Sequence, residues 1–222
     1  QVSIYLDTTG AGLHKRGYRR NSNLAPIRET LAAGILDLAR LRSDTVVCDP
    51  FCGSGTFLIE AARRACKIAP GLDRRFIAEQ WDCVPKTAWQ EARTEALDRI
   101  DRSVGFEGFG FDIDPAAVQL TMDNAKKAGV DKFLHIEQRD IREFQPIAGA
   151  VTICNPPYGE RMLELEEARK IYECMGKVLT APAYIICGDD EFERKFGKKA
   201  DKRRKLYNGM ISCQLYCYFG DK

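Results

Sequence analysis

The sequence predicts an α/β fold built on a doubly wound, mostly parallel β-sheet with helices on both faces. Short apolar, strand-like runs alternate with helix-like runs along most of the 222 residues, which is typical of consecutive β-α-β units. Near the C-terminus, two strand-like runs flank Asn208-Gly209, a strong signal for a β-hairpin. We therefore expect the parallel sheet to end in an antiparallel hairpin.

The N-terminal half begins with a helix, predicted over residues 23–42. Pro26 fits its first turn, where a backbone N–H has no partner inside the helix. The apolar run over residues 45–48 predicts a buried strand that stops at Asp49-Pro50. Two helices follow over residues 55–67 and 85–102, separated by an irregular stretch. Trp81 and Trp89 are expected to pack in the core.

The C-terminal half continues the alternation. A strand over residues 107–112 precedes a helix over 115–127, which Gly129 is expected to end. The other expected strands cover residues 133–138, 150–154 and 184–187, with a helix over 164–179 before the last of them. No break in composition marks a second domain.

Composition excludes several classes of protein. The chain is 45% hydrophobic and 30% charged, so it can bury a core, and it lacks the ~18–20 residue apolar run of a membrane helix. A net charge of +2 and a pI of about 8.1 mean that nucleic-acid binding must rest on local clusters. Nine cysteines without a CxxC pair and two distant histidines argue against disulfides and zinc and favour a cytoplasmic protein.

The first candidate site is the loop Asp49-Pro-Phe-Cys-Gly53-Ser-Gly55-Thr56, between a strand and a helix. Glycines let backbone N–H groups approach a ligand closely, and a helix N-terminus favours negative charge. The loop matches neither GxGxxG nor GxxxxGK[ST]. It indicates a ligand site at the carboxyl end of the strand, with a simple tight turn as the alternative.

Acidic residues follow the next two strands. Asp112 can accept both hydroxyls of a ribose, as acidic residues do in nucleotide-binding folds, whereas Asp114 before Pro115 fits a helix N-cap. Asp140-Ile141 is placed to hydrogen-bond an adenine amino group and to cover its ring. Taken alone, Asp140 is an ordinary loop residue.

Asn155-Pro156-Pro157-Tyr158-Gly159 follows the fourth strand of the parallel sheet. The Asn155 side-chain oxygen and the Pro156 carbonyl can both accept hydrogen bonds from one exocyclic NH₂ group, and Tyr158 offers a ring on which a base can stack. Two acceptors would localise the lone pair of a planar, weakly nucleophilic amino group. A proline-rich turn is the alternative.

Together, these four loops resemble those of the class I S-adenosylmethionine-dependent methyltransferases that methylate amino groups. The resemblance is closest to the RlmL/YpsC-type ribosomal RNA large-subunit guanine-N2 methyltransferases, whose members are often labelled N6-adenine DNA methylases. The stretches that carry it are residues 6–19, 25–33, 49–56 and 155–161.

The resemblance implies a Rossmann-like class I methyltransferase fold with a seven-stranded sheet. Residues 45–222 would form the methyltransferase domain, with an N-terminal segment and helix over residues 1–44 packed on it. Family members normally carry an N-terminal THUMP RNA-binding domain, which is absent from this sequence. Because the chain starts at Gln1, we expect it to be a piece of a longer protein.

The resemblance also implies S-adenosylmethionine as cofactor, no metal, and the N2 amino group of a guanine, in 23S ribosomal RNA, as methyl acceptor. The implied catalytic residues are Asn155, Pro156 and Tyr158. The implied cofactor contacts are Asp49, Phe51, Gly53, Gly55, Thr56, Asp112, Ile113, Asp140, Ile141 and Asn155. The implied RNA contacts are Lys15, Arg16, Arg19, Tyr158 and Arg161.

The motifs leave alternatives open. Asn-Pro-Pro-Tyr does not separate guanine N2 from adenine N6, so N6-adenine methylation of DNA or RNA and guanine-N2 methylation of tRNA both remain. A non-catalytic RNA-binding scaffold would have no chemical need for the Asn155–Tyr158 loop, and the absence of GxGxxG argues against an NAD-dependent oxidoreductase. The basic run over residues 195–205 fits phosphate contact and a solvated face equally well.

Overall fold

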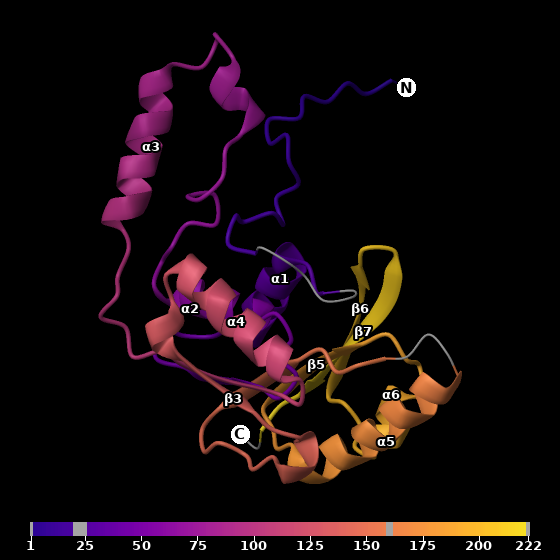
Figure 1. The fold of residues 1–222 in the computed structure, drawn as a ribbon. Coiled ribbons are helices and arrows are strands. Elements are labelled where there is room, and N and C mark those ends of the chain that lie inside the picture. The colour runs from indigo at the N-terminus through magenta and orange to yellow at the C-terminus, as the bar shows by residue number, and fades with distance from the viewer. Residues whose placement is uncertain (1, 20–25, 159–161, 221–222) are drawn as a thin grey trace.

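The computed structural model describes residues 2–19, 26–158 and 162–220, which form a seven-stranded sheet in the order β3-β2-β1-β4-β5-β7-β6 (Figure 1). Neighbouring strands from β3 to β5 are parallel, whereas β7 runs antiparallel to β5 and β6. The predicted parallel sheet with a C-terminal hairpin is therefore confirmed. The strands are β1 (Val46–Asp49), β2 (Glu107–Asp112), β3 (Leu134–Gln138), β4 (Val151–Cys154), β5 (Ala183–Cys187), β6 (Lys202–Asn208) and β7 (Ile211–Tyr218).

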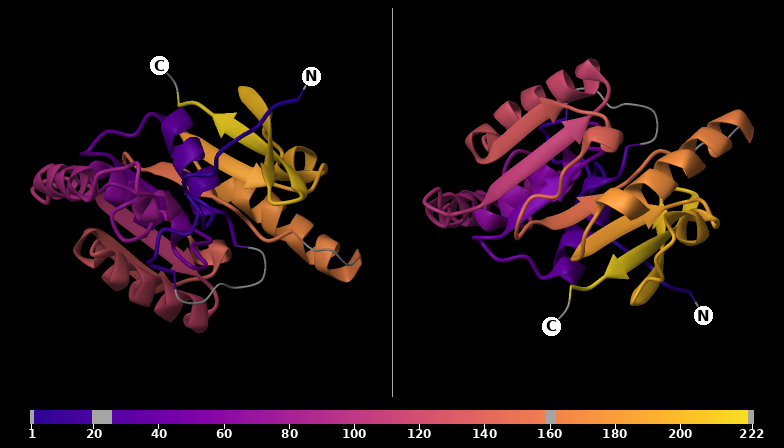
Figure 2. Two further views of the ribbon diagram at one scale, coloured as in Figure 1. Left: turned by 90° about the horizontal axis from the view of Figure 1, so that it is seen from above. Right: turned by 90° about the horizontal axis from the view of Figure 1, so that it is seen from below.

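Helices cover both faces of the sheet (Figure 2). Buried residues of α1, α2 and α4 share one hydrophobic core, and those of α5 and α6 share the other. Within the described residues, no helix combines the length and the apolar character needed to cross a membrane. The helices are α1 (Glu29–Ala39), α2 (Thr56–Ala65), α3 (Lys86–Asp98), α4 (Pro115–Ala128), α5 (Met162–Val178) and α6 (Phe192–Phe196), with 3₁₀ turns η1 (Ile77–Gln80), η2 (Asp131–Phe133) and η3 (Ile141–Glu143).

The central strands β1 and β4 are mostly apolar because both of their faces are buried; their polar residues, Asp49 and Thr152, are buried as well. Val47 and Ile153 belong to the core under α1 and α2, whereas their neighbours Cys48 and Cys154 belong to the core under α5. Successive side chains of a strand point to opposite faces, so a strand between two helical layers has no position for a solvated residue. This register brings the carboxyl ends of β1, β2 and β4 to the same edge of the sheet.

Two sequence predictions about the boundaries were wrong. Helix α1 begins at Glu29, because Arg28 has an extended backbone (ψ 140°), so Pro26 lies before the helix and not in its first turn. Residues 23–25 of the predicted helix lie outside the described residues. The two-residue hairpin turn is Gly209-Met210, one residue later than predicted, and Gly209 takes the positive φ (67°).

Helix α3 contributes no buried residue and projects away from the sheet in Figure 1. The expectation that Trp81 and Trp89 pack in the core was therefore wrong. Both are only half-buried, and Trp89 stacks on Phe76 with ring centroids 5.6 Å apart. Aromatic character alone does not tell a core ring from a ring in a small surface stack.

Residues of the N-terminal segment are fastened to α2 by buried polar contacts. Arg16 pairs with Glu60 at 3.2 Å, and the Tyr18 hydroxyl donates to the same carboxylate at 3.1 Å. The Arg16 and Glu60 side chains are only 9% and 7% exposed. Loss of one partner would leave the other charge buried and unpaired, which makes this pair a structural requirement.

We expect Arg16→Ala to lower the free energy of unfolding by about 3–5 kcal/mol, measured by urea denaturation, because Glu60 would stay buried without its partner. Replacing both members, as Arg16→Met with Glu60→Leu, should recover most of this loss. Arg42→Ala is the control, because the Arg42–Asp44 pair is solvent-exposed and contributes less than about 1 kcal/mol. Equal losses in Arg16→Ala and Arg42→Ala would contradict a structural role.

Candidate functional site

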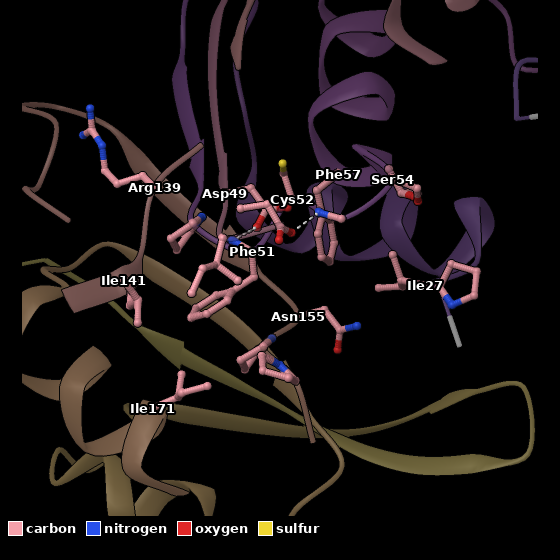
Figure 3. Close-up of a pocket in the computed structure, with 18 of the residues that line it drawn as sticks. Ile27, Asp49, Phe51, Cys52, Ser54, Phe57, Arg139, Ile141, Asn155 and Ile171 are labelled. Atoms are coloured by element: carbon pink, nitrogen blue, oxygen red, sulfur yellow. Dashed lines mark hydrogen bonds between the residues drawn. The ribbon is translucent and has the colours of Figure 1, made fainter. Parts of the chain in front are cut away.

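A cavity of about 450 Å³ opens at the carboxyl edge of the sheet (Figure 3), within the range usual for small-molecule sites. Loops that follow β1, β2, β3 and β4 all contribute to its wall. Its lining includes the sequence-predicted residues Asp49, Phe51, Gly53, Thr56, Asp112, Ile113, Asp140, Ile141, Asn155, Pro156 and Tyr158. The fold therefore brings together residues up to about a hundred positions apart in the sequence.

The loop after β1 is held by polar side chains of α4. Thr121 Oγ1 donates to the Gly53 carbonyl at 2.8 Å, and Asn124 Nδ2 donates to the Ser54 carbonyl at 3.0 Å. Gly53 has a left-handed φ of 55°, which a glycine adopts without strain. The loop is thus shaped before any ligand binds.

Gly55 is not among the residues that line the cavity, so its predicted contact with the cofactor stays a prediction. It precedes α2 with a φ of 77°, and a Cβ at this position would lie 2.7 Å from Thr121 Cγ2. Glycine is required there for the turn into α2 and for close packing against α4. Its role in the site is to position the loop.

Asp112 is fixed at the end of β2 by two backbone donors. Its Oδ2 accepts a hydrogen bond from Gly53 N at 2.9 Å, and its Oδ1 accepts one from Asp114 N at 3.0 Å. Each carboxylate oxygen has more than one acceptor site, so the group can still accept two hydroxyls. Asp114 itself caps α4 by accepting from Ala116 N at 2.8 Å, as its sequence context predicts.

Asp49 is fully enclosed at the end of β1, where it is only 2% exposed. Burial raises the pKa of its carboxyl to about 8; a hydrogen bond from Phe51 N at 3.0 Å opposes this, and nearby Asp112 adds to it. The folded protein therefore holds Asp49 mostly protonated at pH 7. A cation bound in the cavity would favour the ionised form and lower this pKa.

The loop after β3 supplies one polar and one apolar wall. Asp140 accepts from Arg142 N at 2.8 Å and pairs with the Arg142 guanidinium at 3.0 Å. Ile141 is buried against α5, while Ile113 from the β2 loop is 63% exposed at the cavity. Two apolar side chains beside a fixed carboxylate suit a flat heteroaromatic ring with a polar edge.

The loop after β4 presents Asn155 to the cavity. Its side chain points inward in Figure 3, and among the described residues none hydrogen-bonds its amide. The Tyr172 hydroxyl donates to the Pro157 carbonyl at 2.9 Å, which anchors the loop to α5. Tyr158 is half-buried at the end of the described stretch. This loop offers a rigid acceptor at the cavity wall.

Of the predicted basic RNA contacts, Arg16 and Arg19 have partners inside the fold, and their contact with RNA stays a prediction. Arg16 is buried and paired with Glu60, and Arg19 donates to the Ile27 carbonyl and to Thr56 Oγ1 while it pairs with Glu29. Their guanidinium groups serve the fold, because they neutralise buried carboxylates. Lys15 is exposed, whereas Arg161 lies outside the described residues.

Sequence reasoning missed several residues of the cavity wall. Pro26 and Ile27 come from the segment before α1, and Ile171 comes from α5. Arg139 was detectable by its position beside Asp140, but no local pattern points to Ile171. Phe57 and Arg142 were also missed, whereas Pro50, Cys52, Ser54 and Pro157 lie inside the predicted loops without having been assigned a contact.

Comparisons with known proteins agree with this geometry. Residues 16–217 match the family model of the RMKL-like methyltransferase domain. The chain is 39% identical to YpsC of Bacillus subtilis and 38% identical to ribosomal RNA large subunit methyltransferase K/L of Shewanella amazonensis. The alignments cover 99% and 98% of this chain, but only 58% and 32% of those proteins.

A solved structure matches equally well. SMU.472, crystallised in complex with SAH, superposes with a TM-score of 0.89 at 40% sequence identity, over 97% of this chain and 58% of that one. The order of the strands and this match confirm the predicted Rossmann-like methyltransferase fold. The chain belongs to the family of RMKL-like methyltransferase domains, as the resemblance of its four loops predicted.

Proposed function

We propose that this chain transfers a methyl group from S-adenosylmethionine to the N2 amino group of a guanine in 23S ribosomal RNA. The observation that carries the proposal is the Asn155 amide, which faces the cavity from a rigid Asn-Pro-Pro-Tyr loop and has no hydrogen-bond partner among the described residues. The relative from Shewanella amazonensis is named a ribosomal RNA large subunit methyltransferase, which supports RNA as the substrate class.

The cavity fits the cofactor. Its volume, the pre-shaped turn at Gly53 and the fixed carboxylate of Asp112 suit a nucleoside with a charged tail. We assign Asp112 to the ribose, Asp140 with Ile113 and Ile141 to the adenine, and Asp49 to the cationic end. Bound there, S-adenosylmethionine supplies a methyl group activated by its sulfonium.

The protein's own contribution would be positioning and electrostatic. The Asn155 side-chain oxygen and the Pro156 carbonyl accept hydrogen bonds from the base amino group and orient its lone pair toward the cofactor. The Tyr158 ring packs on the base. If the target is paired, the base must first be extruded from its helix, as for other enzymes that act on a base.

We also propose how the domains of the protein are arranged. We place catalysis in residues 45–222, with residues 1–44 packed on that domain. The chain spans about three fifths of YpsC, so a separate RNA-capturing module of the THUMP type is expected in the whole protein. Its substrate, ribosomal RNA, would locate the protein in the cytoplasm.

Tritiated S-adenosylmethionine tests the proposed target. Purified chain is incubated with unmodified 23S rRNA, tRNA and DNA, and each product is digested to nucleosides. We expect label in N2-methylguanosine from 23S rRNA. Label in N6-methyladenine, or in tRNA alone, would replace this target by one of the alternatives left open by the motif.

Asp112→Ala should weaken cofactor binding by about 1–3 kcal/mol, because hydroxyls of the bound ribose would lose their acceptor. Isothermal titration calorimetry with SAH measures this. Asp114→Ala is the matched control, since Asp114 caps the neighbouring helix and does not line the cavity. Equal affinities in the two variants would show that the ribose assignment is wrong.

Cofactor binding should release a proton from Asp49. The free carboxyl has a pKa raised to about 8 by burial, and the cofactor's positive charge favours the carboxylate. The affinity for S-adenosylmethionine should therefore rise with pH up to about 8, by at most about tenfold per unit, and then level off. Calorimetry at pH 7 in buffers of different ionisation enthalpy measures the number of protons released on binding. Asp49→Asn should abolish this release.

Asn155→Ala should reduce the single-turnover rate by about 10²–10³ and leave cofactor affinity unchanged, because Asn155 faces the acceptor amino group. Asn155→Asp keeps an acceptor and should retain more activity. Tyr158→Phe should be mild and Tyr158→Ala severe, since the ring face carries the contact. Full activity of Asn155→Ala with cofactor bound would rule out this mechanism and favour a non-catalytic scaffold.

A further inference from the structure

The hairpin turn between β6 and β7 is tied to one wall of the cavity. Asn208, the last residue of β6, is 8% exposed. Its Oδ1 accepts a hydrogen bond from Arg28 N at 3.3 Å, and its Nδ2 donates to the Pro26 carbonyl at 3.4 Å. Because Pro26 and Ile27 line the cavity, these hydrogen bonds hold the hairpin turn at the mouth of the cavity.

The same turn also reaches the wall formed by the Asn-Pro-Pro-Tyr loop. Ile211, the first residue of β7, and the Tyr158 ring both lie beside Gly188. A Cβ built on Gly188 would be 3.4 Å from Tyr158 Cδ2 and 3.5 Å from Ile211 Cγ2. The hairpin turn therefore stands next to the place where a base would meet Asn155 and Tyr158.

Two large apolar side chains are exposed at this turn. Met210 is 97% exposed in the turn itself, and Tyr207 is 58% exposed at the end of β6. The Lys205 ammonium lies 5.7 Å from the centroid of the Tyr207 ring, on the same face of the strand. Single exposed apolar side chains are common on protein surfaces. Here a methionine, an aromatic ring and a cation lie together at the mouth of the cavity, and they form a surface on which an anionic partner with flat rings can stack.

The positive charges around the hairpin turn indicate which partner binds there. The run Lys202-Arg203-Arg204-Lys205 is exposed and lies on β6, the edge strand of the sheet. Arg203 is neutralised by Glu193 at 2.6 Å, whereas Lys205 sits beside the turn. The exposed guanidinium of Arg28 lies over Gly209, about 3.5 Å from where a Cβ would be. This cluster complements a phosphate backbone that crosses the turn.

We infer that the hairpin turn, residues 207–211, contacts RNA beside the target base. Tyr207 and Met210 pack against nucleotides that flank the extruded base, and Lys205 and Arg28 bind their phosphates. Apolar wedges of this kind keep adjacent bases unstacked in other nucleic-acid complexes. The inference rests on the proposed function, because it takes RNA as the substrate.

RNA affinity tests the proposed contacts of Tyr207 and Met210 with nucleotides. Binding of unmodified 23S rRNA transcript to the SAH-saturated chain is compared between wild type, the double variant Tyr207→Ala/Met210→Ala, and the control Met122→Ala. Met122 is also exposed (47%) but lies on α4, outside the turn. We expect about tenfold weaker binding for the double variant and less than a twofold change for the control. Wild-type affinity of the double variant would overturn the inference.

The salt dependence of RNA affinity tests the proposed phosphate contacts of Lys205 and Arg28. Lys205→Gln and Arg28→Gln should each lower the slope of log affinity against log salt concentration by about 0.7–0.9, the amount expected for one lost phosphate contact. Arg203→Gln is the matched control, because this arginine is already paired with Glu193. Slopes unchanged in both test variants would overturn the assignment of phosphates to this turn.

Binding and methylation are read separately, so the two proposals can fail independently. A wild-type chain that binds 23S rRNA through the turn but transfers no methyl group to guanine would contradict the proposed function and support the inferred surface. Methylation of 23S rRNA that proceeds at the wild-type rate, with wild-type affinity, in Tyr207→Ala/Met210→Ala would contradict the surface and leave the proposed function intact.

Discussion

The hydrogen bond from Gly53 N to Asp112 Oδ2 is the contact on which the geometry of the site depends. It joins the loop after β1 to the end of β2, and it turns a flexible carboxylate into a fixed acceptor. The contact requires α2 to approach β2 closely. Gly110 permits this, because a Cβ there would lie 2.6 Å from Leu58 Cδ1 of α2. Gly110 within the sheet and the hydrogen bond to Asp112 at its edge therefore both depend on the close packing of α2 against β2.

Two arginines near the N-terminus, Arg16 and Arg19, pair with carboxylates inside the fold. Arg19 connects Glu29 of α1 with Thr56, the first residue of α2, and therefore links the N-terminal segment to the loop that lines the cavity. Since the guanidinium groups of Arg16 and Arg19 neutralise buried carboxylates, they are poorly placed to bind phosphates. The exposed cations on β6 and at Arg28 are better suited to that task.

Much of this architecture could be predicted from local pattern. Strand β2 has the predicted bounds, and α4 begins at Pro115 and ends before Gly129, because a buried strand, an N-cap and a left-handed glycine each leave a local signal. The start of α1 was wrong because proline is compatible with both the first helical turn and the extended segment before it. Cavity residues such as Ile171 could not be predicted, since a helix residue facing a ligand and one facing the core have the same spacing.

By itself, the sequence determined the fold class, the order of the strands along the chain and the four loops that carry polar groups. These depend on interactions between residues close in sequence. Only the tertiary structure decided which charges are exposed. Lys15 and Arg16 are adjacent and chemically alike, yet one is solvated and the other is buried against Glu60, which lies 44 positions away. It also decided that the hairpin turn lies at the mouth of the cavity, because the register of β7 on β5 and the contacts of Asn208 with the segment before α1 join residues far apart in sequence.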